Sequence, residues 1–224
     1  MRLLSLCLFS LTTLLVVACS PESKPLPENA TAKEHIVSRS FSEGQHYSVI
    51  PYPVTEPQLQ RYLTEYFWLG CPHCQNFEPL LKGYLEANPS VTLVRKHPAL
   101  GDRWAVDASV FYSLYLHGHE HLVPALLDLY RQTRLDKSTL PDSNAINAFL
   151  AQHQIEQASF ETQRNSEAVS KAMTQANREM LDNRISGVPS LVVNGKYLVN
   201  SEQPADVKTA EDYYQLLDYL LSKE

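Results

Sequence analysis

The chain has 224 residues, of which 44% are hydrophobic, and this is enough for one globular domain or for one domain with an insertion. The formal net charge is −6 and the lysines and arginines are scattered, so no basic stripe is available for nucleic acid. The same negative balance gives no electrostatic reason for adhesion to anionic lipid. We find no internal repeat.

The first 18 residues have the features of an export signal. A mostly apolar run from residue 3 to 17 follows a positively charged start and is too short to span a bilayer comfortably. The ending Leu15-Val16-Val17-Ala18-Cys19 resembles the bacterial lipobox, which implies cleavage before Cys19 and lipidation of that residue. An ordinary signal peptide with an incidental cysteine is the alternative. We therefore expect residues 1–18 to be a lipoprotein signal peptide, and the mature protein to be lipid-anchored on the periplasmic side of a bacterial membrane, where disulfides persist.

Residues 19–42 are predicted to form a flexible tether, because prolines and charges are frequent there and large apolar side chains are few. About 20 such residues reach roughly 25 Å. A short strand is expected at Gly44–Ile50, where prolines end it. The next strand, Leu63–Leu69, is apolar on both faces apart from two residues, which is typical of an interior strand that is covered on both sides.

A pair of cysteines follows this second strand. Gly70 ends the strand and Cys71-Pro72-His73-Cys74 comes at once, before apolar residues recur at helical spacing over Gln75–Ala87. The two cysteines are therefore expected at a strand-to-helix turn. Once the leader is removed no other pair remains to serve as a structural disulfide. A third strand is expected at Val91–Val94.

The long stretch from residue 103 to 177 carries almost no strand signal and is expected to be a helical insertion. Its helical patterns lie at Val106–Leu116, Leu122–Tyr130, Ala145–Ala151 and Glu167–Asn177. The sheet resumes at Pro189–Leu198, where Asn194-Gly195 is a strong hairpin signal. A closing helix is expected at Ala210–Leu221.

This order of elements resembles that of the DsbA family of periplasmic thiol:disulfide oxidoreductases. The resemblance covers about residues 41–222 and includes the Cys-Pro-His-Cys motif, Glu65 six residues before it, Phe77-Glu78 after it, and Gly187-Val188-Pro189 before the hairpin. It implies an α/β, thioredoxin-like fold with an inserted helical domain. Residues 43–102 and 178–224 would then form the thioredoxin-like domain, and residues 103–177 the insertion.

The resemblance also implies an activity and its partners. A family member donates its disulfide to newly exported, reduced and unfolded proteins, and a quinone-linked, DsbB-like membrane partner re-oxidises it. No cofactor is implied, and we expect a monomer. Two other functions remain open: a disulfide isomerase or reductase of the same fold, and a non-enzymatic lipoprotein that binds metal through the motif. A static disulfide is a further alternative for the cysteine pair.

The residues of the motif support a redox role by themselves. A thiolate at a helix N-terminus faces unpaired backbone N–H groups, so Cys71 should ionise more easily than a free cysteine. The resemblance implies a pKa of about 3.5 against about 8.5 for free cysteine, a difference worth about 7 kcal/mol, whereas a helix terminus supplies at most about 2 kcal/mol. His73 is the expected additional donor. Cys74 should be the buried partner, and Pro72 completes the catalytic motif.

Two positions outside the motif are further candidates. Glu65, on an apolar strand, should have a raised pKa and could exchange a proton with Cys74, as the resemblance also implies. Alternatively it points to an edge or pairs with Arg95 or Lys96. Val188-Pro189 should contain a cis peptide bond and offer its backbone to an extended substrate peptide, with a plain turn proline as the alternative.

We interpret several other candidate residues as structural rather than functional. His117, His119 and His121 could bind metal, but their spacing around a glycine favours a solvated loop. Trp104 is expected to pack on the first helix of the insertion, and a contact with the surface around the cysteines is the alternative. Glu78 is interpreted as a structural charge.

Overall fold

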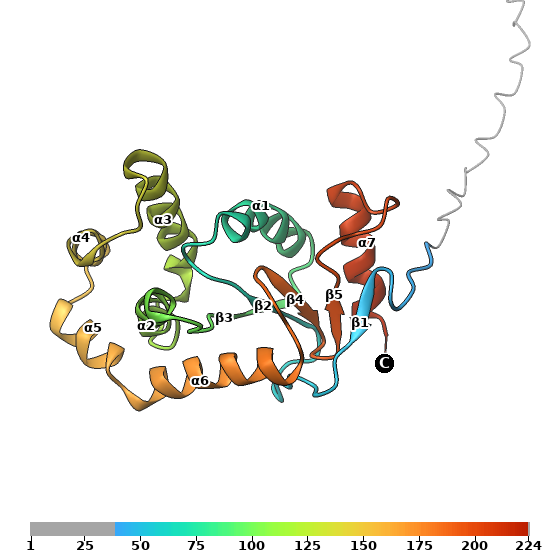
Figure 1. The fold of residues 1–224 in the computed structure, drawn as a ribbon, viewed down its shortest axis with the longest axis horizontal. Helices are drawn as coiled ribbons and strands as arrows, with labels where there is room; N and C mark the ends of the chain where they lie inside the picture. Colours follow the sequence, from blue (N-terminus) through green and yellow to red (C-terminus); the bar gives the residue numbers. More distant parts are fainter. Residues whose placement is uncertain (1–38, 224) are drawn as a thin grey trace, which may run out of the picture. The chain divides into compact units, whose positions relative to one another are not determined.

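The computed structural model describes residues 39–223, so the predicted signal peptide, Cys19 and most of the predicted tether lie outside the described residues. The described residues form one five-stranded sheet and seven α-helices (Figure 1). The strands are β1 (Tyr47–Val49), β2 (Tyr62–Tyr66), β3 (Thr92–Lys96), β4 (Ser190–Val193) and β5 (Tyr197–Val199). The helices are α1 (Pro72–Ala87), α2 (Asp102–Tyr115), α3 (Val123–Lys137), α4 (Ser143–Gln152), α5 (Gln157–Arg164), α6 (Glu167–Asp182) and α7 (Ala210–Leu221).

The sheet is mixed, with the strand order β1-β5-β4-β2-β3. Strand β2 runs parallel to β3 and antiparallel to β4, and all five of its residues are buried. This confirms the expectation of an interior strand. The register places Glu65 beside Arg95 on β3 and beside Leu191 on β4. Glu65 therefore lies on an interior strand, between β3 and β4.

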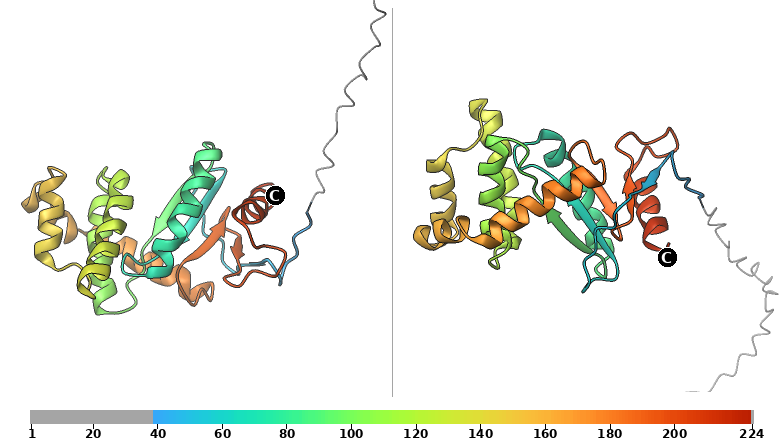
Figure 2. Two further views of the ribbon diagram at one scale, coloured as in Figure 1. Left: turned by 90° about the horizontal axis from the view of Figure 1, so that it is seen from above. Right: turned by 60° about the horizontal axis from the view of Figure 1, so that its bottom comes forward.

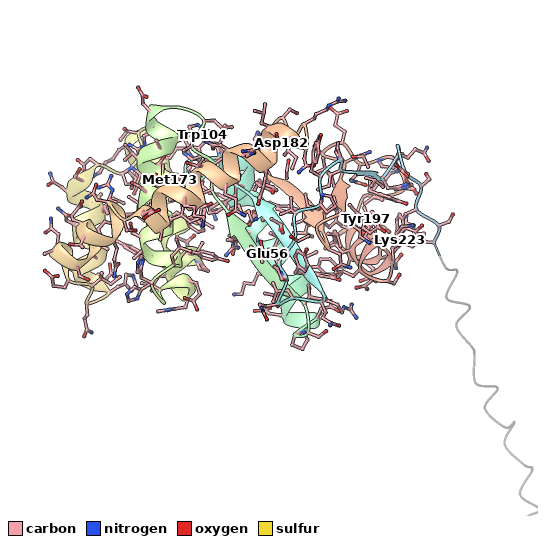
Figure 3. All side chains as sticks on the ribbon, turned by 90° about the horizontal axis from the view of Figure 1, so that it is seen from below. Glu56, Trp104, Met173, Asp182, Tyr197 and Lys223 are labelled. Carbon is pink, nitrogen blue, oxygen red and sulfur yellow. The ribbon has the colours of Figure 1, made fainter. Side chains whose placement is uncertain are left out.

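Helices cover both faces of the sheet. Helices α1 and α7 lie on one face (Figures 1 and 2), where Leu81 and Leu217 pack with Leu63. Met180 of α6 packs with Tyr66 on the other face, and Figure 3 shows α6 crossing the sheet there. Burial of apolar surface on both faces is the main stabilising contribution to this three-layer arrangement.

The helices α2 to α5 form a separate group beyond the β3 edge of the sheet (Figure 2). Their apolar residues, among them Phe111, Leu126 and Phe160, form one cluster that continues to Cys71 and Cys74. The active-site turn is therefore packed against the insertion as well as against the sheet. Among the helices of the described part, none has the length and hydropathy needed to cross a bilayer.

Several boundaries differ from those expected. Helix α1 begins at Pro72 rather than after the motif, because proline is well suited to the first helical position. Helix α5 was not expected, since Phe160 is its only buried residue and the apolar pattern is too sparse to detect. Phe41, within the predicted tether, is buried against the rings of His46 and Tyr219, so packing begins before residue 42.

Candidate active site

The active-site turn places Cys71 at the N-cap of α1. Its backbone is extended, with φ −81° and ψ 117°, and its Sγ accepts a hydrogen bond from the Cys74 backbone N–H at 3.3 Å. Pro72 follows at a position where no N–H is needed. Gly70 precedes the cysteine, and a Cβ at that position would lie 2.6 Å from the ring of Trp68, so this close approach requires glycine. Both cysteines are free thiols here, with 6% of Cys71 and 1% of Cys74 exposed.

The two thiols have opposite electrostatic environments. A hydrogen bond from the Cys74 thiol, together with the backbone N–H groups of Cys74 and His73 and the charge of His73, lowers the pKa of Cys71 to about 6, although burial opposes the shift. Burial, followed by the hydrogen bond to Cys71, raises the pKa of Cys74. At neutral pH the reduced site therefore holds a thiolate at Cys71 and a thiol at Cys74.

His73 acts on this thiolate mainly through its backbone. The N–H of His73 lowers the pKa of Cys71 more than the charge of its side chain does, and the imidazole is exposed. The pKa of about 6 for Cys71 is below the ordinary range but above the value that the family resemblance implies.

The segment before β4 faces the cysteine. The Val188-Pro189 peptide bond is cis, as expected, and Cys71 Sγ lies 3.7 Å from the Val188 carbonyl oxygen. An open groove of about 780 Å³ begins beside this contact. Its walls include His73, Phe77, Ile185, Val188, Pro189 and Tyr213.

Glu65 lies beneath the turn with a cation beside it. Its carboxylate is buried, and Arg95 Nε donates to its Oε2 at 3.0 Å. Burial raises the pKa of Glu65 to about 7, although Arg95 opposes the shift. Arg95 also forms an ion pair with Glu78. The raised pKa is thus confirmed, and so is the pairing with Arg95, whereas Lys96 instead binds Glu179 and Glu56 on the other face of the sheet.

The charges of this cluster are coupled to the cysteines. Negative charge on Cys71 raises the pKa of Glu65, and negative charge on Glu65 raises the pKa of Cys74. Although burial lowers the pKa of Arg95, the carboxylates of Glu65 and Glu78 hold it above its ordinary value. The cation therefore stays charged, and a proton that moves in this cluster must reside on a carboxyl or a thiol.

Sequence reasoning did not identify the residues that hold the turn from outside. The Leu69 N–H donates to His97 Nε2 at 3.2 Å, and Gln75 Nε2 donates to the Leu69 carbonyl oxygen at 2.8 Å. Trp68 Nε1 donates to the buried carboxylate of Asp107 at 2.8 Å. The one available signal was an aspartate within the apolar pattern of the first insertion helix.

The other candidates from the sequence, Trp104 and the three histidines, contact neighbouring protein groups. Trp104 stacks on Trp68 with ring centroids 4.6 Å apart, so it contacts the turn that carries the cysteines. His119 and His121 have ring centroids 6.2 Å apart, and His117 Nδ1 lies 3.1 Å from the Ser113 carbonyl oxygen. Residues 39–223 contain no group of three or more histidine, cysteine, aspartate or glutamate side chains placed to hold a metal ion.

In this mixed sheet, an interior strand leads into a helix that is capped by one of two neighbouring cysteines, and a cis-proline lies opposite. Together these features define a thiol:disulfide oxidoreductase of the thioredoxin fold. A family model described as Thioredoxin matches residues 56–212. The chain is 31% identical over 190 residues to the thiol:disulfide interchange protein DsbA of Pseudomonas aeruginosa, which covers 82% of this chain and 86% of that protein. It is also 31% identical over 198 residues to the protein of the same name from Azotobacter vinelandii, with coverage of 87% and 89%.

Solved structures agree with these relatives. The crystal structure of Pseudomonas aeruginosa DsbA matches with a TM-score of 0.66 and 29% identity, over 81% of this chain and 93% of that one. The chain therefore belongs to the DsbA family of thiol:disulfide interchange proteins. It is an oxidoreductase of disulfide-bond formation.

Proposed function

We propose that this protein donates the Cys71–Cys74 disulfide to reduced, unfolded exported proteins and thereby forms disulfide bonds in them. The observation that carries the proposal is the asymmetry of the two thiols, since a lowered pKa at Cys71 and a raised pKa at Cys74 favour the reduced enzyme with a stable thiolate. Stabilising the reduced form makes the disulfide a stronger oxidant.

The cycle has two exchange steps. A substrate thiolate attacks Cys71 Sγ, the Cys71–Cys74 bond breaks, and Cys74 leaves with the electron pair and takes up a proton. A second substrate thiolate then attacks the substrate sulfur of the mixed disulfide, and Cys71 leaves as a thiolate. The substrate gains one disulfide and the enzyme gains two electrons. A sulfur with a low pKa is a good leaving group in the second step.

Glu65 is proposed as the proton donor and acceptor for Cys74. A carboxyl with a pKa of about 7 can give or take a proton at neutral pH, and its charge already influences Cys74. Arg95 keeps this carboxyl from being wholly protonated at neutral pH. Glu78 would share the cation rather than react.

Val188 and Pro189 are proposed to bind the substrate backbone. An extended peptide that pairs with Val188 would lie across the Val188 carbonyl, which is 3.7 Å from Cys71 Sγ, and could continue into the neighbouring groove. A substrate cysteine would thereby be presented beside the reactive sulfur. His73 also lines this groove.

The cellular setting belongs to the proposal as well. The leader and Cys19 support a lipid-anchored protein on the periplasmic side of a bacterial membrane, with residues 19–42 mostly a tether. A quinone-linked, DsbB-like membrane partner would re-oxidise the dithiol. Residues 103–177 would form the helical insertion of a monomeric enzyme, between the two parts of the thioredoxin-like domain, 43–102 and 178–224.

One assay separates the candidate functions. The oxidised protein is mixed with an equal amount of a reduced, unfolded test protein, and free thiols of both are counted over time. We expect rapid loss of substrate thiols, with no oxidation by Cys71→Ser or Cys74→Ser. When the assay is instead started from a wrongly paired substrate, rearrangement without net oxidation would favour an isomerase. Stoichiometric copper or zinc binding without turnover would favour a metal-binding lipoprotein.

A further inference from the structure

We infer that Gln75 is a positioning residue for Cys71, and that it connects the active-site turn to the helical insertion through Arg134. This inference deepens the proposed function, because it assigns to the insertion a part in setting the reactivity of the nucleophile. It stands on the hydrogen bonds that join Leu69, Gln75 and Arg134.

The segment to be positioned is a tight turn. The Cys71 N–H donates to the Trp68 carbonyl oxygen at 2.9 Å, so Leu69 and Gly70 are its two central residues. The orientation of the Leu69 peptide groups therefore decides where the N-cap cysteine lies relative to the first N–H groups of α1. Those N–H groups, from His73 and Cys74, act on the Cys71 sulfur.

The Leu69 residue is held at both of its backbone polar groups. His97 Nε2 accepts from its N–H at 3.2 Å, and Gln75 Nε2 donates to its carbonyl oxygen at 2.8 Å. Gln75 is 4% exposed, and its Oε1 accepts from Arg134 Nη2 of α3 at 2.8 Å. A side-chain amide that both donates and accepts in this way has its orientation fixed.

Few other interactions explain the position of the Arg134 guanidinium beside Gln75. Within residues 39–223 it forms no ion pair with a carboxylate, and its buried Nε has no hydrogen-bond partner. Taking part of a guanidinium out of water without a counter-ion is unfavourable for stability. The contact with Gln75 is therefore better explained by a requirement of the turn than by a gain in folding free energy.

A second contact from the insertion reaches the same turn. Trp68 Nε1 donates to Asp107 Oδ2, and the carboxylate of Asp107 is fixed by Arg103 and by the Tyr130 hydroxyl at 2.7 Å. The indole of Trp68 in turn closes over Gly70. The insertion thus contacts the turn in two places. Asp107 holds the side chain of Trp68, and Arg134 holds Gln75, which in turn binds the Leu69 carbonyl oxygen.

The test compares Gln75→Met and Arg134→Met with Arg131→Met, whose side chain is exposed on the same helix. For each full-length protein we would measure the pH dependence of thiolate absorbance, the equilibrium with glutathione and the thermal midpoint. A loosened turn should raise the pKa of Cys71 from about 6 towards about 7. The thiolate fraction at pH 7 then falls from about nine-tenths to about half, and the equilibrium constant changes about fivefold, or by about 20 mV towards a weaker oxidant.

The outcomes separate this inference from the proposed function. Unchanged thiolate titration and glutathione equilibrium in both variants, with only a lower thermal midpoint, would show that the bridge is merely structural and overturn the inference. If Gln75→Met does not fold, Arg134→Met and Arg134→Gln, which leave Gln75 in place, decide the question by the same two readouts. Failure of the wild-type protein to oxidise a dithiol substrate would instead overturn the proposed function.

Discussion

Reducing the Cys71–Cys74 disulfide should stabilise the folded protein by an amount that grows with pH. The folded pKa of Cys71 is about 6, and a free cysteine in the unfolded chain titrates at about 8.5. A group whose folded pKa is lowered contributes stability that is complete above the unfolded pKa and is lost as the pH falls through the folded pKa. The window therefore runs from about pH 6 to about pH 8.5.

The magnitude follows from these two pKa values. At pH 7 the thiolate contributes about 1.4 kcal/mol, and the limit above pH 8.5 is about 3 kcal/mol. Solvent in the groove beside the sulfur partly screens the charge, so we expect about 1 kcal/mol at pH 7. Burial raises the pKa of Cys74, so its thiol stays protonated in the folded protein, whereas in the unfolded chain it ionises near pH 8.5. Cys74 therefore offsets a small part of the gain at the upper end of the window, and the gain from Cys71 still dominates up to pH 8.5.

Urea denaturation of the reduced and oxidised forms, at several pH values across this window, measures the effect. The Cys71→Ser variant serves as the control, since it keeps the titrating carboxyl of Glu65 and lacks the thiolate. The difference in free energy of unfolding between reduced and oxidised protein should increase with pH. The difference between the reduced wild-type protein and Cys71→Ser, which cannot form the disulfide, should increase in the same way. A difference that stays constant between pH 6 and pH 8.5 would refute the reasoning.

Three further changes have calculable outcomes. Arg95→Met leaves the buried carboxylate of Glu65 and the half-buried carboxylate of Glu78 without their cation and should lower the free energy of unfolding by about 3 kcal/mol at neutral pH, measured by urea denaturation. Glu65→Gln should slow the attack of the Cys74 thiol on a mixed disulfide about 100-fold at pH 8 and remove the rise in this rate near pH 7, measured by rapid-quench kinetics. Gly195→Ala should destabilise by about 3 kcal/mol or more, measured by thermal denaturation, because φ is +65° and the new Cβ would lie 2.0 Å from the Val54 carbonyl oxygen.

Each of these predictions has a matched control. Lys82→Met removes an exposed cation from α1 and should cost less than about 1 kcal/mol, and equal losses for Arg95→Met would contradict the buried cluster. Glu86→Gln removes a carboxylate at the exposed end of α1 and should leave the kinetics of mixed-disulfide resolution unchanged. Gly101→Ala places its Cβ in open space, so a comparable loss there would contradict the steric argument for the hairpin.

The order of elements could be predicted because each has a strong local cause. The apolar run ending at Gly70, the cysteine motif after it and Asn194-Gly195 in the hairpin are signals that each span only a few residues. The ends of strands and helices were predicted less accurately where local signals are weak. Strand β2 ends at Tyr66 rather than Leu69, since the following residues leave the sheet to form the active-site turn, and α6 continues to Asp182 on one buried stripe.

The contacts that hold the candidate site were predictable only in part. Pairing of Glu65 with Arg95 was one of the alternatives, and the parallel register of β2 and β3 determines it. Gln75 and Arg134 are 59 positions apart, and no local pattern relates them. Such contacts depend on how the insertion packs against the turn, which neither spacing nor hydropathy specifies.

The redox potential of the wild-type protein, measured by equilibration with glutathione, tests most directly whether it is an oxidant. A stable thiolate at Cys71 beside a protonated Cys74 should give a potential more positive than about −200 mV. A value close to that of thioredoxin, about −270 mV, would contradict the proposal that this protein donates its disulfide to other proteins.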